Sequence, residues 1–245
     1  MSGIDLKKAF AFAWSSFKGN LPFYILGLLI ALLAFSTLFG IVAAPLKAVS
    51  WLLHFLFQGV AGWIDSLVAL IAFALKCLVF APLFVGFLKG IKKEADEPGE
   101  KASVADLFLG FQGYLSTVVF SAVMMVMLYI AASIGAALLP WLSFLPVLLL
   151  CPVLSLGLYY LAEGCSGSLG LEAIIKAFKN WSLLLELMII IAMMASIAVG
   201  FAICCVGLLA TVPLGIATCW HLCRQHDQGP GPSLKGEQAE IGTPS

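Results

Sequence analysis

The chain has 245 residues, of which 62% are hydrophobic and 11% are charged, and its net charge is zero. Soluble domains carry about 25% charged residues, so this chain cannot cover a water-exposed surface with polar groups, and we expect an integral membrane protein. The charge balance also excludes the basic composition typical of proteins that bind nucleic acid.

The N-terminal segment 4–18 reads IDLKKAFAFAWSSFK and places apolar side chains at helical spacing, with its lysines mainly on other faces. This pattern predicts an amphipathic helix that lies in the membrane interface. Asn20, Leu21 and Pro22 form a boundary, because proline is tolerated in a first helical turn. The uncharged segment 21–44 can cross about 30 Å of hydrocarbon and is the first predicted span.

The segment 46–64 is apolar but carries polar side chains, glycines and two tryptophans. Because tryptophan is enriched at membrane interfaces, the pattern predicts an interfacial segment, and it leaves a re-entrant helix open. The second span is predicted at 66–88. It carries Lys76 near its middle, and we expect a kink or bend near Pro82.

The stretch 89–106 holds the only dense run of charge between two long apolar regions. We expect it to lie outside the membrane, where it fixes the orientation of the chain. Ser103 and Asp106 have the spacing of a capping box, which predicts that a short amphipathic helix with the sequence ADLFLGFQGY begins there. The third predicted span, 115–139, follows this helix.

A fourth span is predicted at 142–161. It contains Pro146 and Pro152, so we expect it to be irregular. A small, glycine-rich loop follows, and the segment 171–181, LEAIIKAFKNW, predicts a third short amphipathic helix.

The apolar run 183–223 is interrupted only by Glu186 and is about twice the roughly 20 residues that one crossing needs. A tight hairpin is therefore required between Gly200 and Gly207, which gives spans at 183–202 and 206–224. The sequence thus predicts a polytopic membrane domain over 1–226. The tail 227–245 is rich in glycine, proline and polar residues, and we expect it to be a disordered cytoplasmic tail.

A weak internal repeat connects these elements: an amphipathic segment is followed by two spans, three times over. The three amphipathic segments contain AFAFAWSSFKGN, ADLFLGFQGY and IIKAFKNW. The predicted fold is therefore all-α: an integral membrane bundle of about six transmembrane helices with short amphipathic interfacial helices.

With six spans, the N-terminus, the 89–106 loop, the 163–181 segment and the tail share one side of the membrane. That side holds nearly all of the basic residues, namely Lys7, Lys8, Lys18, Lys89, Lys92, Lys93, Lys101, Lys176, Lys179, Arg224 and Lys235. The opposite side holds Lys47. The positive-inside rule then places both termini in the cytoplasm, and a change of one in the span count would destroy this asymmetry.

Lys76 is the sharpest candidate for a functional residue, because a charge near the middle of a membrane is costly and often marks a polar pathway or a partner. Glu186, about one turn into the fifth span, is the nearest plausible counter-ion. The two side chains could form an internal polar site for transport or merely hold helices together. Alternatively, Lys76 extends along the helix to the interface, as lysine side chains readily do.

Two further patterns have a functional and a structural interpretation. Lys89, Lys92 and Lys93 could meet anionic lipid head groups, worth about 1 kcal/mol per charge, although topology alone also requires such a cluster. Gly86 and Gly90 form a GxxxG motif, which permits close helix contact.

Cys219, Cys223 and His226 lie at i, i+4 and i+7, so one helix face could present two thiols and an imidazole to a metal ion. The helix is apolar and no second cluster completes four ligands, which favours packing. The seven cysteines lie mostly in apolar runs, so we expect no disulfide framework. We expect no metal and no cofactor.

Three stretches together resemble a poorly characterised group of bacterial multi-pass membrane proteins: ADLFLGF, LEAIIKAFKNW and the closing hairpin through VPLGIATCWHLCR. This group includes the membrane domain beside some glycerophosphodiester phosphodiesterases. The resemblance covers roughly residues 4–225 and implies a bacterial inner-membrane location and about six helices. It carries over no catalytic residues, and we expect no phosphodiesterase barrel in this chain.

No recognised catalytic motif occurs in the sequence. The leading hypothesis is a non-enzymatic inner-membrane protein whose interfacial helices organise lipid or a partner protein, which could be another membrane protein or a second copy of the chain. The second hypothesis is a transporter or channel for a small or lipid-like solute, which uses Lys76 and Glu186. A lumen lined by these two side chains would favour the second hypothesis, and a closed apolar bundle would favour the first.

Overall fold

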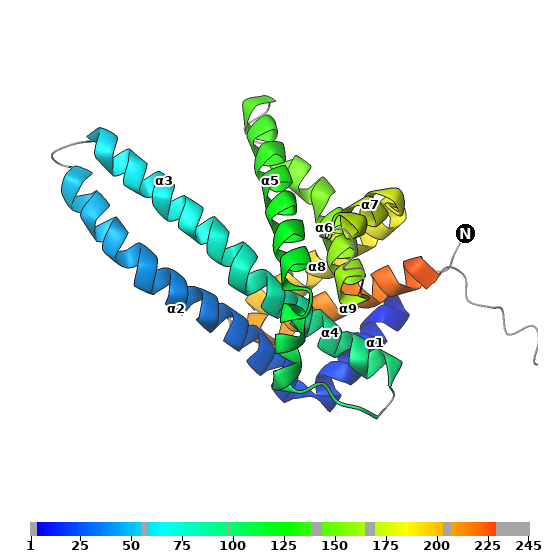
Figure 1. Ribbon diagram of the computed structural model, residues 1–245. Coiled ribbons are helices and arrows are strands. Elements are labelled where there is room, and N and C mark those ends of the chain that lie inside the picture. The colour runs from blue at the N-terminus through cyan, green and yellow to red at the C-terminus, as the bar shows by residue number, and fades with distance from the viewer. Residues whose placement is uncertain are drawn as a thin grey trace, which may run out of the picture.

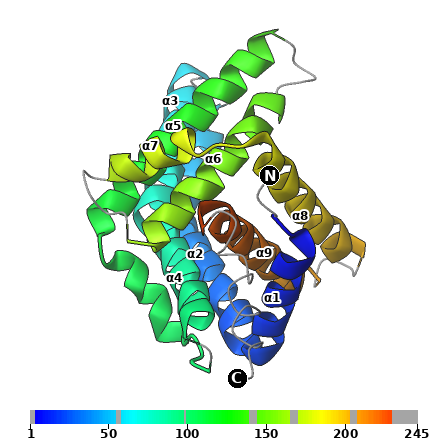
Figure 2. The same ribbon diagram turned by 90° about the vertical axis from the view of Figure 1, so that its right-hand side faces the viewer.

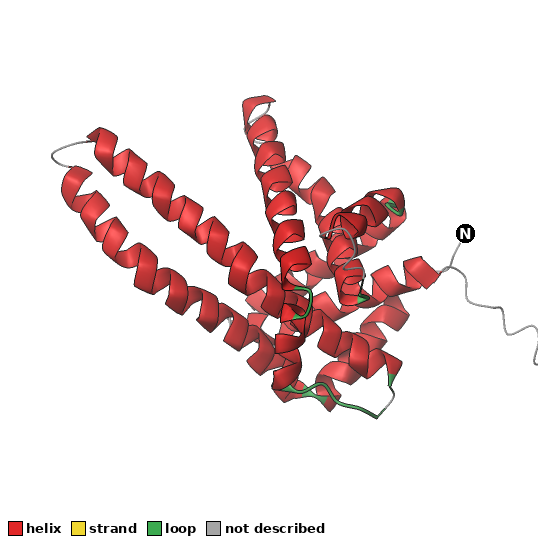
Figure 3. Ribbon diagram, viewed as in Figure 1, coloured by secondary structure: helices red, strands yellow, loops and turns green. Residues whose placement is uncertain are grey.

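The computed structural model describes residues 4–54, 58–97, 99–138, 144–164, 170–202 and 207–228. Nearly all of this described part is helical, and it contains no strand (Figure 3). The all-α prediction is confirmed. The predicted tail 227–245 lies almost entirely outside the described residues, apart from Asp227 and Gln228, which end the final helix.

The three predicted amphipathic segments are present as short helices. They are α1 (Leu6–Gly19), the 3₁₀ helix η2 (Val104–Phe111) and α7 (Leu171–Lys179), and we call them the lead-in segments. The predicted capping box begins η2: the backbone N–H of Ser103 donates to Asp106 Oδ2 at 2.7 Å. Helix α1 begins in a similar way, because the Asp5 carboxylate accepts from the first backbone N–H groups of the helix.

Each lead-in segment is followed by a helical hairpin (Figure 1). In the first hairpin, α2 (Leu21–His54) is paired with a continuous rod made of α3 (Gln58–Leu75), the π-turn η1 (Lys76–Phe80) and α4 (Ala81–Asp96). In the second, α5 (Tyr114–Leu138) is paired with α6 (Phe144–Ala162), and in the third α8 (Leu183–Ala202) with α9 (Leu208–Gln228). The order of elements follows the predicted repeat, and the last hairpin reverses where the sequence requires it.

Four helical stretches of the described chain are long and apolar enough to cross a membrane: Leu21–His54, Gly62–Asp96, Tyr114–Ser133 and Leu183–Gly200. The chain is therefore a multi-pass helical membrane protein. Helices α6 and α9, which occupy the fourth and sixth predicted spans, are not among these four, so the count of six stays a prediction.

The segment 46–64 differs from the sequence prediction. Helix α2 continues through Pro45 to His54, and α3 begins at Gln58, so the described residues of this segment extend the two helices of the first hairpin and form no separate element. Backbone groups in hydrocarbon must bond internally, so scattered polar side chains do not end a helix there. The 34 residues of α2 extend about 51 Å at 1.5 Å per residue, which requires tilt or protrusion beyond a 30 Å core.

The prolines of the inner helices have unequal effects. The irregularity expected near Pro82 is the π-turn η1, whose final N–H, from Ala81, donates to the carbonyl of Lys76. Helix α6, by contrast, is not broken at Pro146 or Pro152, and the irregularity expected there stays a prediction. Pro146 lies in the first turn, where its missing N–H has no intrahelical partner in any helix.

The packing of the elements is cyclic. Each lead-in segment packs on the second helix of the preceding hairpin: η2 on α4, α7 on α6, and α1 on α9. The first helix of each hairpin also contacts that same preceding helix, as α5 contacts α4, α8 contacts α6 and α2 contacts α9. The three second helices, α4, α6 and α9, contact one another at the centre, and we call them the inner helices.

Away from this shared base the hairpins diverge. Figure 1 shows α2 and α3 leaning away from α5, and Figure 2 shows α8 directed away from α5 on another side. Many large apolar side chains of these arms are exposed, for example Leu33, Ile41 and Ile191. A water-exposed surface of this kind would be strongly unfavourable, whereas hydrocarbon accommodates it.

Small residues let the lead-in segments approach the inner helices closely. Ala9 and Ala13 of α1 and Ala173 and Ala177 of α7 are fully buried. In η2 the same role falls to Gly110, where an added Cβ would lie 1.7 Å from the Pro82 carbonyl oxygen. Small residues serve close helix packing in membranes, where apolar burial gives little driving force.

The predicted GxxxG contact is present, although its partners are not another GxxxG helix. A Cβ on Gly86 would lie 1.8 Å from the Leu107 carbonyl oxygen of η2. A Cβ on Gly90 would lie 2.3 Å from the Phe23 ring of α2. Gly86 therefore faces backbone that cannot be moved without displacing η2.

We expect Gly86→Ala to destabilise the protein by about 1–3 kcal/mol, because the new methyl group forces η2 off α4. The measurement is thermal or denaturant unfolding of the purified protein in a nonionic detergent. Gly40→Ala is the matched control, since nothing lies within 4 Å of a Cβ at that helical position. Equal stability of the two variants would contradict the close contact.

Candidate functional site

Polar contacts join the C-terminal ends of the three inner helices in pairs. Lys92 Nζ of α4 lies 2.8 Å from Glu163 Oε2, directly after α6, and both side chains are half-buried. The Tyr160 hydroxyl of α6 donates to Asp227 Oδ1 of α9 at 2.9 Å. These two contacts link α4 to α6 and α6 to α9.

The third contact returns to the first helix. Arg224 of α9 pairs with Asp96 of α4 at 2.6 Å, and its guanidinium lies over the Trp220 ring, 5.4 Å from the centroid. Each inner helix is thus joined to the other two, and we call these six residues the polar ring, namely Lys92, Asp96, Tyr160, Glu163, Arg224 and Asp227. A closed set of contacts constrains the three ends more than separate surface pairs do.

Further hydrogen bonds attach the lead-in segments to the inner helices near the ring. Lys89 Nζ donates to the Leu109 carbonyl at 2.8 Å and so stabilises the end of η2. The Asp5 N–H, at the start of α1, donates to Gln225 Oε1 of α9 at 2.8 Å. These contacts follow the same cyclic order as the packing.

Asn180, at the end of α7, attaches this lead-in segment to the inner helices. Its Nδ2 donates to the Tyr160 hydroxyl, so this hydroxyl accepts from Asn180 and donates to Asp227. The Asn180 carbonyl lies 2.7 Å from His226 Nε2 of α9. One asparagine therefore connects α7 with both α6 and α9.

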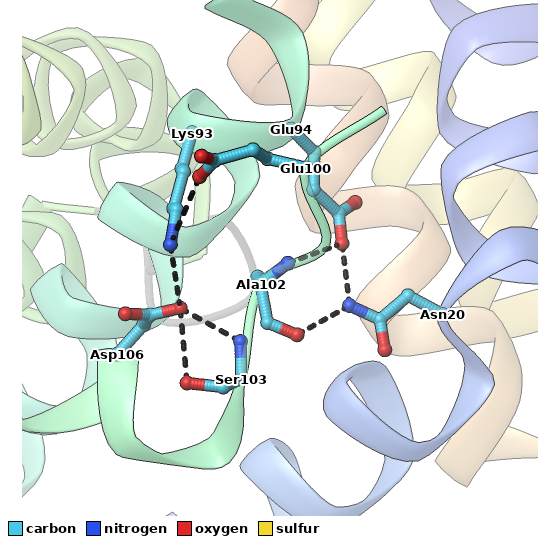
Figure 4. Close-up of polar contacts among 7 residues, drawn as sticks. All are labelled: Asn20, Lys93, Glu94, Glu100, Ala102, Ser103 and Asp106. Carbon is cyan, nitrogen blue, oxygen red and sulfur yellow. Dashed lines mark hydrogen bonds and ion pairs between the residues drawn. The ribbon is translucent and has the colours of Figure 1, made fainter. Parts of the chain in front are cut away.

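The charged stretch 89–106 folds back onto the junction of α1 and α2 (Figure 4). Buried Asn20 donates through Nδ2 to Glu94 Oε1 and to the Ala102 carbonyl, both at 2.6 Å. The Ala102 N–H completes this arrangement by donating to Glu94 Oε1 at 3.1 Å, and the Tyr24 hydroxyl donates to the other oxygen of Glu94.

The lysines that the sequence offers to lipid head groups have protein partners. Lys93 pairs with Glu100 at 3.3 Å and lies 3.9 Å from Asp106 (Figure 4). Lys92 belongs to the polar ring, and Lys89 bonds η2. Their main contacts therefore stabilise the base of the protein, and a role with lipid stays a prediction.

Apolar cavities lie beside the inner helices. A cavity of about 310 Å³ is lined by Leu88 of α4, Leu158 of α6, Ile190 of α8 and Trp220 of α9, and we call it the α6/α8 cavity. A second cavity of about 440 Å³ is lined by Leu32 of α2, Lys76 of η1, Ser121 of α5 and again Leu158, and we call it the α2/α5 cavity. Phe84, Leu154 and Leu158 line both cavities, so apolar side chains separate them.

A third cavity, of about 810 Å³, lies between α1 and the last hairpin, and we call it the α1/α8 cavity. It is lined by Phe10 and Trp14 of α1 and by Ile191 and Val199 of α8. All four of these side chains are exposed, so the cavity opens toward the surroundings of the helices.

The structure does not bring the two intramembrane candidates together. Lys76 is exposed and lines the α2/α5 cavity. Glu186 is 3% exposed in the first turn of α8, and its Oε2 has no hydrogen-bond partner in the described chain. The ion pairs of the described residues include none between them, so no shared polar site of Lys76 and Glu186 is formed.

The possible metal ligands are not gathered for coordination. No group of three or more His, Cys, Asp or Glu residues in the described chain has a metal-binding arrangement. Cys219 and Cys223 are buried thiols. His226 instead contacts the Asn180 carbonyl through Nε2.

Sequence reasoning missed the polar ring and Ser121. The sequence gives one indication of the polar ring, because charged residues follow or end each of the even-numbered spans. Which of these residues contact each other depends on the rotation of the helices. Ser121 had no signal, because a single serine in an apolar helix is unremarkable.

No family model, curated protein or solved structure matches the chain. The resemblance to the group that includes the membrane domain of some glycerophosphodiester phosphodiesterases therefore stays a prediction.

A double-mutant cycle measures the strength of one ring contact. With Lys92→Met, Glu163→Gln and the double variant, we expect a coupling of about 1 kcal/mol or more, because the pair is half-buried and held between two packed helices. The readout is the free energy of unfolding in detergent.

The control cycle uses Glu172 and Lys176, an i,i+4 pair on α7 whose side chains are 46% and 42% exposed. Its expected coupling is about 0.3–0.5 kcal/mol. A ring coupling no larger than this value would show that the Lys92 contact does not hold α4 to α6.

Proposed function

We propose that this protein is a non-enzymatic multi-pass membrane protein that binds and organises lipid chains in the cavities between its hairpins. The observation that carries the proposal is the pairing of a polar ring at one end of the inner helices with open apolar cavities beside them. An amphipathic lipid has the same division into a polar end and an apolar body.

The lining of the cavities supports lipid over a polar solute. The α6/α8 cavity opens beside exposed Met194, and the α2/α5 cavity opens beside exposed Leu32. Both openings lie on the arms of the hairpins that face hydrocarbon in a bilayer. Lipid chains can therefore enter sideways, without passing the polar ring.

The outer faces of the lead-in segments also support contact with lipid. Each exposes large apolar side chains in addition to its small buried residues: Phe10 and Trp14 in α1, Phe108 and Phe111 in η2, and Ile175 and Phe178 in α7. Because these segments lie beside the charged ends of the hairpins, aromatic and apolar side chains there would enter the head-group boundary.

The polar groups near the ring support a non-enzymatic role. Lys92, Arg224 and Tyr160 each bond another ring residue, and Glu94 is held by Asn20 and the Ala102 N–H. These groups are used to close the base of the protein.

The alternative, a transporter with an internal Lys76 and Glu186 site, has less support. The two residues lie on different elements, and no ion pair joins them. The wall of Phe84, Leu154 and Leu158 separates the α2/α5 cavity from the α6/α8 cavity.

We also propose that the protein lies in a bacterial inner membrane with both termini in the cytoplasm. The location rests on the sequence resemblance. The orientation rests on the concentration of basic residues at the polar-ring end, where Lys89, Lys92, Lys93 and Arg224 gather, against Lys47 near the far end of the first hairpin.

Lipid binding is tested by native mass spectrometry of protein extracted gently from its membrane. We expect several lipids to remain bound and Ile190→Trp, which fills the α6/α8 cavity, to lower their number. Leu184→Trp is the control, because Leu184 is exposed on the same helix and does not line that cavity. Protein free of bound lipid, or equal lipid loading of both variants, would contradict the proposed function.

Orientation is tested by labelling single cysteines with a membrane-impermeant maleimide, in a variant that lacks the native cysteines. Lys101→Cys lies in the exposed part of the charged loop, and Trp63→Cys lies near the far end of the first hairpin. In intact spheroplasts we expect labelling at position 63 and protection at position 101. The reverse pattern would overturn the orientation.

A further inference from the structure

The α2/α5 cavity combines a long apolar wall with two polar residues. Most of the lining is aromatic or aliphatic, and the polar exceptions are Lys76 of η1 and Ser121 of α5, with the thiol of Cys77 beside them. Its volume of about 440 Å³ lies within the roughly 300–1,000 Å³ of small-molecule sites. An apolar cavity with few placed polar groups is the usual form of a ligand site.

Lys76 has no ion-pair partner in the described part of the chain, although it lies far from the charged end of its helix. Thirteen positions separate it from Lys89, which is about 20 Å along the axis at 1.5 Å per residue. A lysine at that depth in hydrocarbon is unfavourable by about 2.5–3.5 kcal/mol or more unless it is paired. A bound anion would supply the counter-ion that the described residues do not.

Ser121 supplies an independent indication of a ligand. The residue is 6% exposed, and its buried Oγ has no hydrogen-bond partner among the described residues. A buried hydroxyl without a partner costs about 1–3 kcal/mol, and such groups in native proteins call for an explanation. Helix α5 packs against η1, so Ser121 and Lys76 line the same cavity from adjacent elements.

The local backbone is also unusual at this point. Lys76 begins the π-turn η1, the interruption that precedes Pro82 in the rod of the first hairpin. Single π-turns inside helices occur often at functional sites, because the extra residue changes the direction of the side chains around it. Here the turn supplies Lys76, Cys77 and Phe80 to the cavity lining.

We propose that the α2/α5 cavity binds one molecule of a single-chain carboxylic acid of the fatty-acid class. One carboxylate oxygen pairs with Lys76 Nζ and the other accepts from the Ser121 hydroxyl. The chain packs against Phe35, Phe80 and Met125. This assignment rests on the proposed lipid-binding function and specifies the lipid class for one of its cavities.

The polar groups that line the cavity favour a carboxylate as the head group of the ligand. One ammonium and one hydroxyl satisfy the two oxygens of a carboxylate, whereas a phosphate monoester presents three acceptor oxygens. The depth of Lys76 also disfavours bilayer phospholipid, whose phosphate stays at the interface. A positively charged or neutral amphiphile would leave the ammonium unpaired.

The test uses delipidated full-length protein in a nonionic detergent, with palmitate as the probe and with hexadecanol, hexadecylamine and phosphatidylglycerol as comparators. Binding is measured by native mass spectrometry and by the rise in melting temperature. We expect palmitate to bind more tightly than the three comparators. Lys76→Gln is expected to weaken palmitate roughly tenfold or more and to leave hexadecanol unchanged.

Two further variants and a control assign the site. Ser121→Ala is expected to weaken palmitate by a smaller factor, and Ala81→Trp, which fills the cavity, to abolish its binding. Lys47→Gln removes an exposed lysine from the far part of α2 and is expected to change nothing. Because the melting temperature is measured for every variant without ligand, loss of binding is separated from loss of folding.

Three results would overturn the assignment of a carboxylate. These are palmitate and hexadecanol binding equally, Lys76→Gln leaving palmitate unchanged, and phosphatidylglycerol binding best in a Lys76-dependent manner. In each case lipid binding between the hairpins survives. If no amphiphile binds the protein at all, the proposed function fails together with this assignment.

Discussion

Polar contacts at the C-terminal ends of α4, α6 and α9 join the three helices on which the other elements pack. In a membrane the hydrophobic effect gives little attraction between helices, so the packing of small residues and polar contacts must hold the helices together. Here Lys92–Glu163, Tyr160–Asp227 and Arg224–Asp96 join each inner helix to both others. The lead-in segments bind in the same cyclic order, through alanine and glycine contacts and through Asn180, Lys89 and Gln225. Polar groups therefore hold the inner helices together at the ring end. The parts of the hairpins away from this end are available to lipid.

The open arms follow from this concentration of contacts at one end. Away from the ring, the hairpins share few polar groups and diverge (Figure 1). Apolar cavities remain between the arms, and most of their lining side chains are apolar. A lysine placed in one of these cavities cannot use the ring as a counter-ion, since the ring's carboxylates already have partners. This separation explains why Lys76, rather than the Lys89 to Lys93 cluster, is the residue that points to a ligand.

Local sequence signals predicted the local structure well. The capping box at Ser103, the three amphipathic segments and the reversal between Gly200 and Gly207 each depend on residues close together in the chain. The continuation of α2 past Pro45 was missed, because polar residues and tryptophans also mark interfaces in many membrane proteins. The pairing of Lys76 with Glu186, which the sequence left open, is absent from the ion pairs of the described residues for a different reason. The sequence indicates how deep a residue lies in the membrane, but not how each helix is rotated or which helices are its neighbours. The contacts of the polar ring and the position of Ser121 depend on this rotation and on these neighbours.

The central claim is that the three inner helices form a closed ring, and cysteine cross-linking in the native membrane tests it most directly. In a background without native cysteines, the double variants K92C/E163C, Y160C/D227C and D96C/R224C are treated with a short bismaleimide. All three pairs should cross-link efficiently, whereas K92C paired with S133C, on the exposed far part of α5, should not. If one of the three ring pairs fails to react while the other two react, the ring is open and the account is wrong.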